Sequence, residues 1–138
     1  DSLAERMGSN WNLKYSGSQQ YAANWKVAIE NSLEAYHVEA VHPKTFGASP
    51  GEERCEHTFF ERGTAFKTDM PFASHNRMDH FFQNWQSRMM RWMKQDVTGT
   101  YQQIHLYPNL LLSFTDAITL VHSVVPLLPQ ESLSRFFI

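Results

Sequence analysis

The residues best suited to chemistry lie in one short segment, Glu30 to Pro43, written ENSLEAYHVEAVHP. His37 and His42 can each offer a neutral imidazole to a metal ion. Positions five apart diverge by about 140° on a regular helix, so an unbroken helix cannot direct both rings at one ion. Pro43 disfavours helical backbone for the residue before it. We therefore expect His37 on the last helical turn and His42 at or beyond the helix end, where it can turn back.

A carboxylate stands close enough to support such a site. Glu34 lies one turn before His37, on the same face of the expected helix. It could accept a hydrogen bond from the imidazole nitrogen that does not hold the metal. Glu39 lies about 200° from His37 and is more simply part of a solvated face. An alternative remains open, because the chain has seven histidines and two of them can fall close together without binding a metal.

The elements that must position these residues can be read from periodicity. Apolar residues at three-to-four spacing predict one helix that begins after an N-cap at Asn24 and continues to the His37 region. Further along we expect a hairpin over 55–69 with a turn at 62–63, a helix over 78–93, and strands over 101–107, 110–114, 118–125 and 133–138, with a weak strand over 13–21. Strands and helices segregated in this way indicate an α+β fold with an antiparallel sheet.

Composition narrows the classes of function. The 138 residues fit one domain, and the net charge of −2 offers no basic stripe for nucleic acid. No apolar run approaches the roughly 18 residues that span a bilayer, and the N-terminus lacks the pattern of a signal peptide. The single cysteine, Cys55, fits a reducing compartment. We therefore expect a cytoplasmic protein that binds neither nucleic acid nor membrane.

Residues 24–43, NWKVAIENSLEAYHVEAVHP, resemble the signature of the catalytic domain of Rieske-type non-haem iron oxygenases. The family pattern is Asn-Trp-Lys, then Glu-Asn, an acidic residue, two residues, His, four residues and His, and every position is matched. The downstream segments YPNLLLSF and VVPLLPQESLSR also resemble the sheet of that domain. The resemblance implies a helix-grip, START-like fold in which an antiparallel sheet wraps around helices. It also implies that residues 1–138 are part of one catalytic domain, incomplete at the C-terminus.

The resemblance implies specific roles within the signature. His37 and His42 would bind a mononuclear Fe(II). Glu34 would be the bridging acid that connects the iron ligand of one subunit to a histidine ligand of the Rieske cluster in the neighbouring subunit. Glu at this position resembles a subset of the family that includes oxygenases of quaternary ammonium compounds.

Two further parts of the family's machinery are expected elsewhere. The third iron ligand, a carboxylate on a late helix, is expected beyond Ile138, since Asp69 and Asp116 are more simply turn residues. A Rieske 2Fe-2S cluster needs two cysteines and two histidines. Cys55 and His57 match one half of that motif, but the chain has one cysteine, so the Rieske domain is expected upstream of residue 1.

The implied activity is oxygenation of a small molecule. Dioxygen would be activated at Fe(II) to hydroxylate, or oxidatively dealkylate, an aromatic or quaternary-ammonium-type compound. Electrons would come from NAD(P)H through a reductase or ferredoxin and the Rieske cluster, in a homotrimer or an α3β3 assembly. The isolated chain is expected to be inactive. The alternatives are a non-enzymatic helix-grip ligand-binding module and a hydrolytic zinc site; the latter lacks a glutamate next to the first histidine and has the wrong histidine spacing.

The helix over 78–93 carries a Met and aromatic face, for which ordinary core packing is the simpler interpretation. The functional alternative places Trp85, Met89 and Trp92 along the substrate entrance, where the indoles could attract a cation. His105 and His122 fall in expected strands, and either point into the cavity or pack on a face of the sheet. We include His105 with the candidate pocket residues. His75 and His80 are expected on the surface.

Overall fold

The computed structural model describes residues 12–41, 52–69, 77–93, 97–116 and 118–138. The elements, in chain order, are β1 (Ser16–Tyr21), α2 (Trp25–Glu30), α3 (Tyr36–Val41), the 3-10 turn η1 (Glu52–Arg54), β2 (Glu56–Phe60), β3 (Gly63–Asp69), α4 (Arg77–Trp92), β4 (Thr100–Leu106), β5 (Leu110–Phe114), β6 (Thr119–Leu128) and β7 (Glu131–Phe137).

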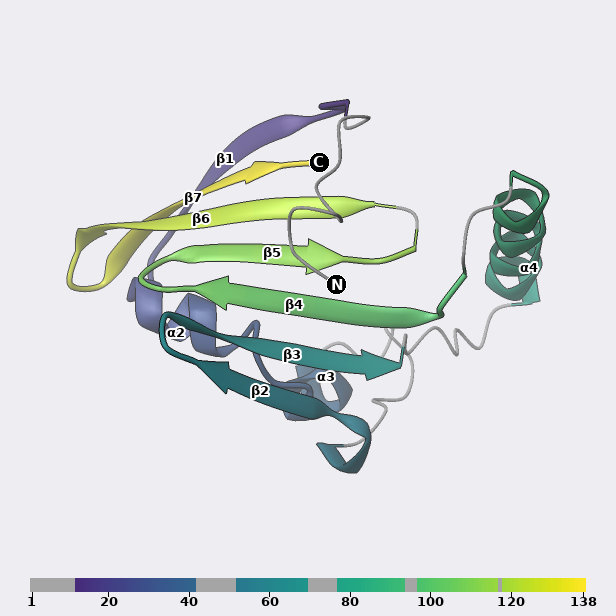
Figure 1. The fold of residues 1–138 in the computed structure, drawn as a ribbon. Coiled ribbons are helices and arrows are strands. Elements are labelled where there is room, and N and C mark those ends of the chain that lie inside the picture. Colours follow the sequence, from purple (N-terminus) through teal and green to yellow (C-terminus); the bar gives the residue numbers. More distant parts are fainter. Residues whose placement is uncertain (1–11, 42–51, 70–76, 94–96, 117) are drawn as a thin grey trace.

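One antiparallel sheet of seven strands dominates the fold, in the order β1-β7-β6-β5-β4-β3-β2. The strands β2 to β7 follow one another as a meander, and β1 adds to the far edge by pairing with β7. Figure 1 shows the sheet from one side, with α2 and α3 drawn behind it. The predicted α+β fold, with an antiparallel sheet around helices, is confirmed.

The helix α2 packs on one face of this sheet through a small apolar core. Ile29 of α2 meets Leu111 of β5 and Val124 of β6, and all three are buried. Trp25, Ala28 and Leu33 pack around them. Asn24 caps the helix by accepting from the amide of Lys26 at 3.0 Å, and its own amide nitrogen donates to the Pro129 carbonyl at 2.7 Å. The cap thereby ties the start of α2 to the turn between β6 and β7.

The two faces of the sheet differ in charge. Directly paired residues on neighbouring strands point to the same face, so the register assigns each strand residue to the side of Leu111 and Val124 or to the opposite side. We call the first side the helix-facing face. Within the seven strands it carries no Asp, Glu, Lys or Arg. All charged strand residues lie on the opposite face: Glu56, Lys67, Asp69, Glu131 and Arg135.

The helix predicted from Asn24 onward is not continuous. The first helix ends at Glu30, and α3 begins at Tyr36. The Ser32 hydroxyl donates to the Ala28 carbonyl at 3.0 Å, while the amides of Ser32 and Leu33 bond carbonyls only three residues back. Such side-chain competition and tightened turns end a helix. Periodicity missed the break because Leu33 and Tyr36 kept helical spacing, yet Tyr36 is exposed.

Two strand boundaries also differ from expectation. β6 was expected to end at Pro126 but continues to Leu128, with a register irregularity between these two residues. A proline is tolerated in a strand at such a bulge, because the ladder bond it cannot donate is already interrupted there. In the first hairpin Phe60 pairs with Gly63, so its turn is residues 61–62 rather than 62–63.

The helix α4 stands to one side of the sheet in Figure 1. Its length agrees with prediction, but its described aromatic residues do not pack in a core: Trp85 is 56% and Trp92 is 83% exposed, and Phe81 is exposed as well. Met90 of the same helix, in contrast, is buried. The core-packing interpretation is therefore wrong for these side chains. In the part of the chain described, no helix has the length and apolar character needed to cross a membrane.

His122 lies on the helix-facing face of β6, where its Nε2 forms a hydrogen bond with the hydroxyl of Ser134 on β7. Burial penalises the imidazolium form and lowers the pKa of His122 below its ordinary value of 6.5. Ser134 is fully buried, so this pair is a polar contact within the core layer rather than a surface feature.

We predict that the close backbone approach at Gly63 does not tolerate a side chain. A Cβ there would lie 2.0 Å from the carbonyl oxygen of His105. Gly63→Ala should therefore lower the free energy of unfolding by about 1–3 kcal/mol, measured by urea denaturation. Gly17→Ala is the control, because the new Cβ would meet ring atoms of Phe136 that can shift. Equal destabilisation by both variants would contradict this explanation.

The partly buried His122 predicts a loss of stability on the acid side. As pH falls below 6.5, the unfolded chain takes up a proton that the folded protein binds only at lower pH. The free energy of unfolding should decrease through that window and then level off below the folded pKa. His122→Gln should make the slope of Tm against pH shallower between about pH 5 and 7. An unchanged slope would show that His122 does not contribute to it.

Candidate functional site

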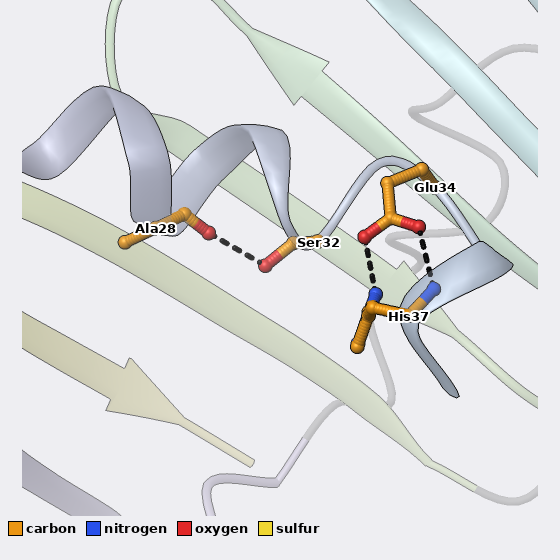
Figure 2. Close-up of polar contacts among 4 residues, drawn as sticks. All are labelled: Ala28, Ser32, Glu34 and His37. Atoms are coloured by element: carbon orange, nitrogen blue, oxygen red, sulfur yellow. Dashed lines mark hydrogen bonds and ion pairs between the residues drawn. The ribbon is translucent and has the colours of Figure 1, made fainter. Parts of the chain in front are cut away.

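The centre of the candidate site is a carboxylate that holds one histidine at two points. Glu34 lies just before α3, and His37 lies in the first turn of that helix. Glu34 Oε2 accepts from the backbone amide of His37 at 3.1 Å. Glu34 Oε1 contacts His37 Nδ1, so a single side chain fixes both the backbone and the ring of His37, as Figure 2 shows.

The contact between Glu34 and His37 is largely screened from water. The side chains of His37 and Glu34 are 17% and 16% exposed, and Ala35 between them is buried. A charge-assisted hydrogen bond in such a setting is stronger than an exposed ion pair. With Nδ1 directed at the carboxylate, a metal would be bound through Nε2. This is the usual arrangement in which a carboxylate sets the tautomer and orientation of a metal-binding histidine.

The local sequence explains why Glu34 can do this. Figure 2 shows the Ser32 hydroxyl bonded to the Ala28 carbonyl, just before the chain turns toward α3. Glu34 is consequently not one turn earlier on the same helix as His37, as predicted. It stands outside α3 and caps that helix, accepting from an amide three residues ahead. The predicted contact between the two side chains is present, but a break in the helix produces it.

The second predicted iron ligand, His42, lies outside the described residues, and so do residues 43–51. Among the residues that are described, no three His, Cys, Asp or Glu side chains come together in a way that could hold a metal ion. The described part of the site therefore fits one histidine ligand with its orienting carboxylate, which is what a single arm of an iron site requires.

Asp116 has a structural role in a loop. Its carboxylate accepts from the amides of Thr98 and Gly99 at 2.9 and 2.8 Å, and Gly99 has a φ of 64°. Burial acts to raise the pKa of Asp116, but the hydrogen bonds from Thr98 and Gly99 outweigh it and lower the pKa. Asp69 ends β3 opposite Thr100. Asp116 thus agrees with the expectation of a turn residue, whereas Asp69 is the last residue of a strand and not part of a turn.

The candidate pocket residues fall in two separate places. Trp85, Met89 and Trp92 lie on α4, and all three are exposed. His105 lies on the helix-facing face of β4, where its Nε2 is 3.1 Å from the Pro108 carbonyl oxygen. Figure 1 draws α4 beyond the end of the sheet at which β4 begins, whereas His105 is near the end of that strand. A substrate pocket formed by these four residues stays a prediction.

Sequence reasoning missed a row of neutral polar side chains on the helix-facing face. The Tyr101 hydroxyl donates to Gln103 Oε1 and lies 3.4 Å from Ser113 Oγ on β5. Burial raises the pKa of Tyr101, and the bond with Ser113 acts against that rise. The signal was present in TYQQIHL, because a period of two places Tyr101, Gln103 and His105 on one face.

We predict that the cap formed by Glu34 stabilises the protein. Glu34→Ala removes the acceptor for the His37 amide and should lower the free energy of unfolding by about 1 kcal/mol, measured by thermal or urea denaturation. Glu30→Ala is the matched control, because Glu30 is an exposed glutamate at the end of α2. A loss for Glu34→Ala no larger than that of the control would contradict the capping role.

Comparison with solved structures shows the same fold in one kind of enzyme. A quaternary ammonium Rieske monooxygenase, CntA, in complex with the inhibitor MMV12 matches with a TM-score of 0.63 and 16% identity, over 91% of this chain and 29% of that one. The structure described as giving insights into carnitine oxidation by gut microbiota and inter-subunit electron transfer matches with a TM-score of 0.62 and 15% identity, over 91% and 30%.

The CntA complex with L-carnitine is similar, with a TM-score of 0.62 and 16% identity, over 91% of this chain and 28% of that one. The chain therefore spans about three tenths of the length of these structures. No curated protein matches the sequence. The family model for the ring hydroxylating alpha subunit (catalytic domain) matches residues 6–137. That match covers almost the whole chain and includes the segment with Glu34 and His37, and the chain belongs to the family of ring-hydroxylating alpha-subunit catalytic domains.

Proposed function

We propose that this chain is the iron-binding part of an oxygenase that hydroxylates, or oxidatively dealkylates, a small molecule. One observation carries the proposal: the Glu34 carboxylate holds His37 by its backbone amide and by Nδ1, in the segment that matches the family signature. A partly buried carboxylate aimed at one nitrogen of a histidine prepares the other nitrogen for a metal.

His37 and His42 would hold a mononuclear Fe(II), with a carboxylate as third ligand from a part of the protein beyond Ile138. Two histidines and one carboxylate on one face leave coordination positions for dioxygen and substrate, so the bound ion would supply the activation of dioxygen. We further propose that residues 1–138 belong to one catalytic domain of a longer protein, with the Rieske domain upstream.

Within this chain, Glu34 has two proposed tasks. It keeps the proton of His37 on Nδ1, which directs Nε2 toward the metal. As the bridging acid it would also connect His37 to a histidine of a Rieske 2Fe-2S cluster in a neighbouring subunit, which requires a homotrimer or an α3β3 assembly. Electrons would arrive from NAD(P)H through a reductase or ferredoxin. Supporting the assembly, one similar structure is described in terms of inter-subunit electron transfer.

The substrate class is inferred from the similar structures and from the acid at position 34. The similar structures are quaternary ammonium monooxygenases, and by sequence resemblance Glu34 corresponds to the acid of that subset of the family. Their identity to this chain is 15–16%, which supports a shared fold. We propose an aromatic or quaternary-ammonium-type substrate and a cytoplasmic location, the latter from the single cysteine. We propose that residues 1–138 alone would not turn over, because one cysteine cannot hold a Rieske cluster.

The proposal is tested by metal content in the full-length protein. His37→Ala should abolish stoichiometric iron and substrate oxidation, measured by elemental analysis and by the electron paramagnetic resonance of the nitric oxide adduct. Glu34→Ala leaves His37 available as an iron ligand. It should weaken iron binding by about 10–100-fold, because the His37 ring loses the carboxylate that orients it.

His57→Ala is the matched control for these variants, since His57 is an exposed histidine on β2. It should leave iron content unchanged, because His57 is neither of the two proposed histidine ligands. Retention of both iron and turnover in His37→Ala would sink the assignment. A wild-type protein that binds hydrophobic ligands but no iron would favour a helix-grip binding module instead.

A further inference from the structure

The helix-facing face of the sheet combines polarity with an absence of charge. In the described strands this face has no Asp, Glu, Lys or Arg, yet β3, β4 and β5 place Thr68, Tyr101, Gln103 and Ser113 on it. Thr68, Gln103 and Ser113 are each more than nine-tenths buried. Side chains that hydrogen-bond without charge therefore lie on the helix-facing side of β3, β4 and β5.

Three hydroxyls on this face lack a hydrogen-bond partner among the described residues, those of Thr64, Ser132 and Thr68, and Thr68 is the one paired with Tyr101. It is 5% exposed, and within the described residues its hydroxyl has no hydrogen-bond partner. Thr68 is paired with Tyr101 across β3 and β4, and the Tyr101 hydroxyl bonds Gln103 and Ser113. The unmet hydroxyl thus adjoins an existing polar row. A buried hydroxyl without a partner costs free energy that a ligand can recover by bonding it.

The segment over residues 25–41, which contains α2 and α3, offers no buried lysine or arginine. Over residues 25–41 the one Lys or Arg is Lys26, which is exposed and places its Nζ 5.8 Å from the centre of the Trp25 ring. The partly buried charged side chain on this side is Glu34, an acid. A carboxylate brought between these layers would lose water and find no lysine or arginine of residues 25–41 or of the helix-facing strand positions to pair with.

Aromatic rings add to the same region of the face. Phe66 of β3 lies between the rings of His57 and Tyr101, with centroid distances of 5.2 and 6.4 Å. These rings accommodate an apolar body or, through their faces, a cationic head group. They do nothing to stabilise an anion, so the whole region favours a neutral or cationic ligand.

From these observations we propose that the substrate group lying against β3–β5 is an uncharged hydrogen-bonding group such as a hydroxyl, that Thr68 is the residue that selects for it, and that a carboxylate is rejected. The inference rests on the proposed oxygenase function, since it names the substrate chemistry of that same site. One of the similar structures contains L-carnitine, which carries a carboxylate, so the similar fold alone would suggest a carboxylate-bearing substrate. The preference proposed here is the opposite.

The test compares two matched pairs of compounds on the iron-loaded, full-length protein without oxygen. The pairs are 2-phenylethanol with phenylacetate, and choline with glycine betaine, so each pair exchanges a hydroxyl for a carboxylate on the same body. Binding is measured by calorimetry. In at least one pair the hydroxyl compound should bind about tenfold or more tightly than its carboxylate partner. Equal or tighter binding of the carboxylates, or no binding by either hydroxyl compound, overturns the proposal.

Variants of Thr68 then assign the preference to a residue. Thr68→Val, which keeps the side-chain shape, should weaken binding of the preferred hydroxyl compound by about tenfold, and Thr68→Ser should retain it. Thr58→Val is the matched control, because Thr58 is exposed on the opposite face of β2. Unchanged binding in Thr68→Val removes Thr68 from the site. If Thr68→Val does not fold, Thr68→Ser still tests the proposal. Loss of the preference for the hydroxyl compound in Thr68→Ser would contradict the role of the Thr68 hydroxyl.

The proposed oxygenase function and the proposed preference for a hydroxyl group are tested by different measurements. Loss of the proposed oxygenase function would appear as a wild-type protein without stoichiometric iron. Failure of the substrate inference would appear as a lost or reversed preference between hydroxyl and carboxylate compounds in a protein that does contain iron.

Discussion

The double contact between the Glu34 carboxylate and His37 is the interaction on which the candidate site depends. It starts α3 by accepting the His37 amide, and it sets the orientation of the ring that α3 carries. The same carboxylate therefore supports both the start of α3 and the orientation of the His37 ring. The contact exists because α2 stops at Glu30, which frees Glu34 from the helix and lets its side chain reach forward. A continuous helix would have given the two side chains only a surface pairing one turn apart.

The sheet contributes a second constraint, the separation of charge between its two faces. Charged strand residues stay on the face away from α2, while serine, threonine, tyrosine and glutamine side chains populate the helix-facing face. The helix-facing face therefore offers hydrogen bonds to a polar group and no charged strand side chain that would bind it as an ion. The buried His122–Ser134 pair follows the same rule, because its imidazole is held preferentially in the neutral form. The fold thus combines an acid at the proposed iron ligand His37 with a sheet face that carries no charged strand residue.

Much of the fold was predictable from sequence, since alternation in the strands and helical spacing in α4 each reflect local geometry. The segment around His37 was recognisable because its residue types and spacing are specific. The break between α2 and α3 was not predictable from periodicity, because Leu33 kept the apolar spacing while hydrogen bonds from Ser32 ended the helix. The exposure of Trp85 and Trp92 was missed for a related reason: an apolar stripe indicates that a face needs cover but not where the cover comes from. The polar row around Gln103 needed the strand register, which brings residues from different strands together.

The central claim is that Glu34 holds Nδ1 of His37 so that iron is bound through Nε2. The most direct measurement is a crystal structure of the iron-loaded, full-length protein, with the metal located by anomalous scattering at the iron edge. The account predicts iron on Nε2 of His37, with the Glu34 carboxylate still hydrogen-bonded to Nδ1. Iron bound to Nδ1, or to a set of residues that excludes His37, would contradict it.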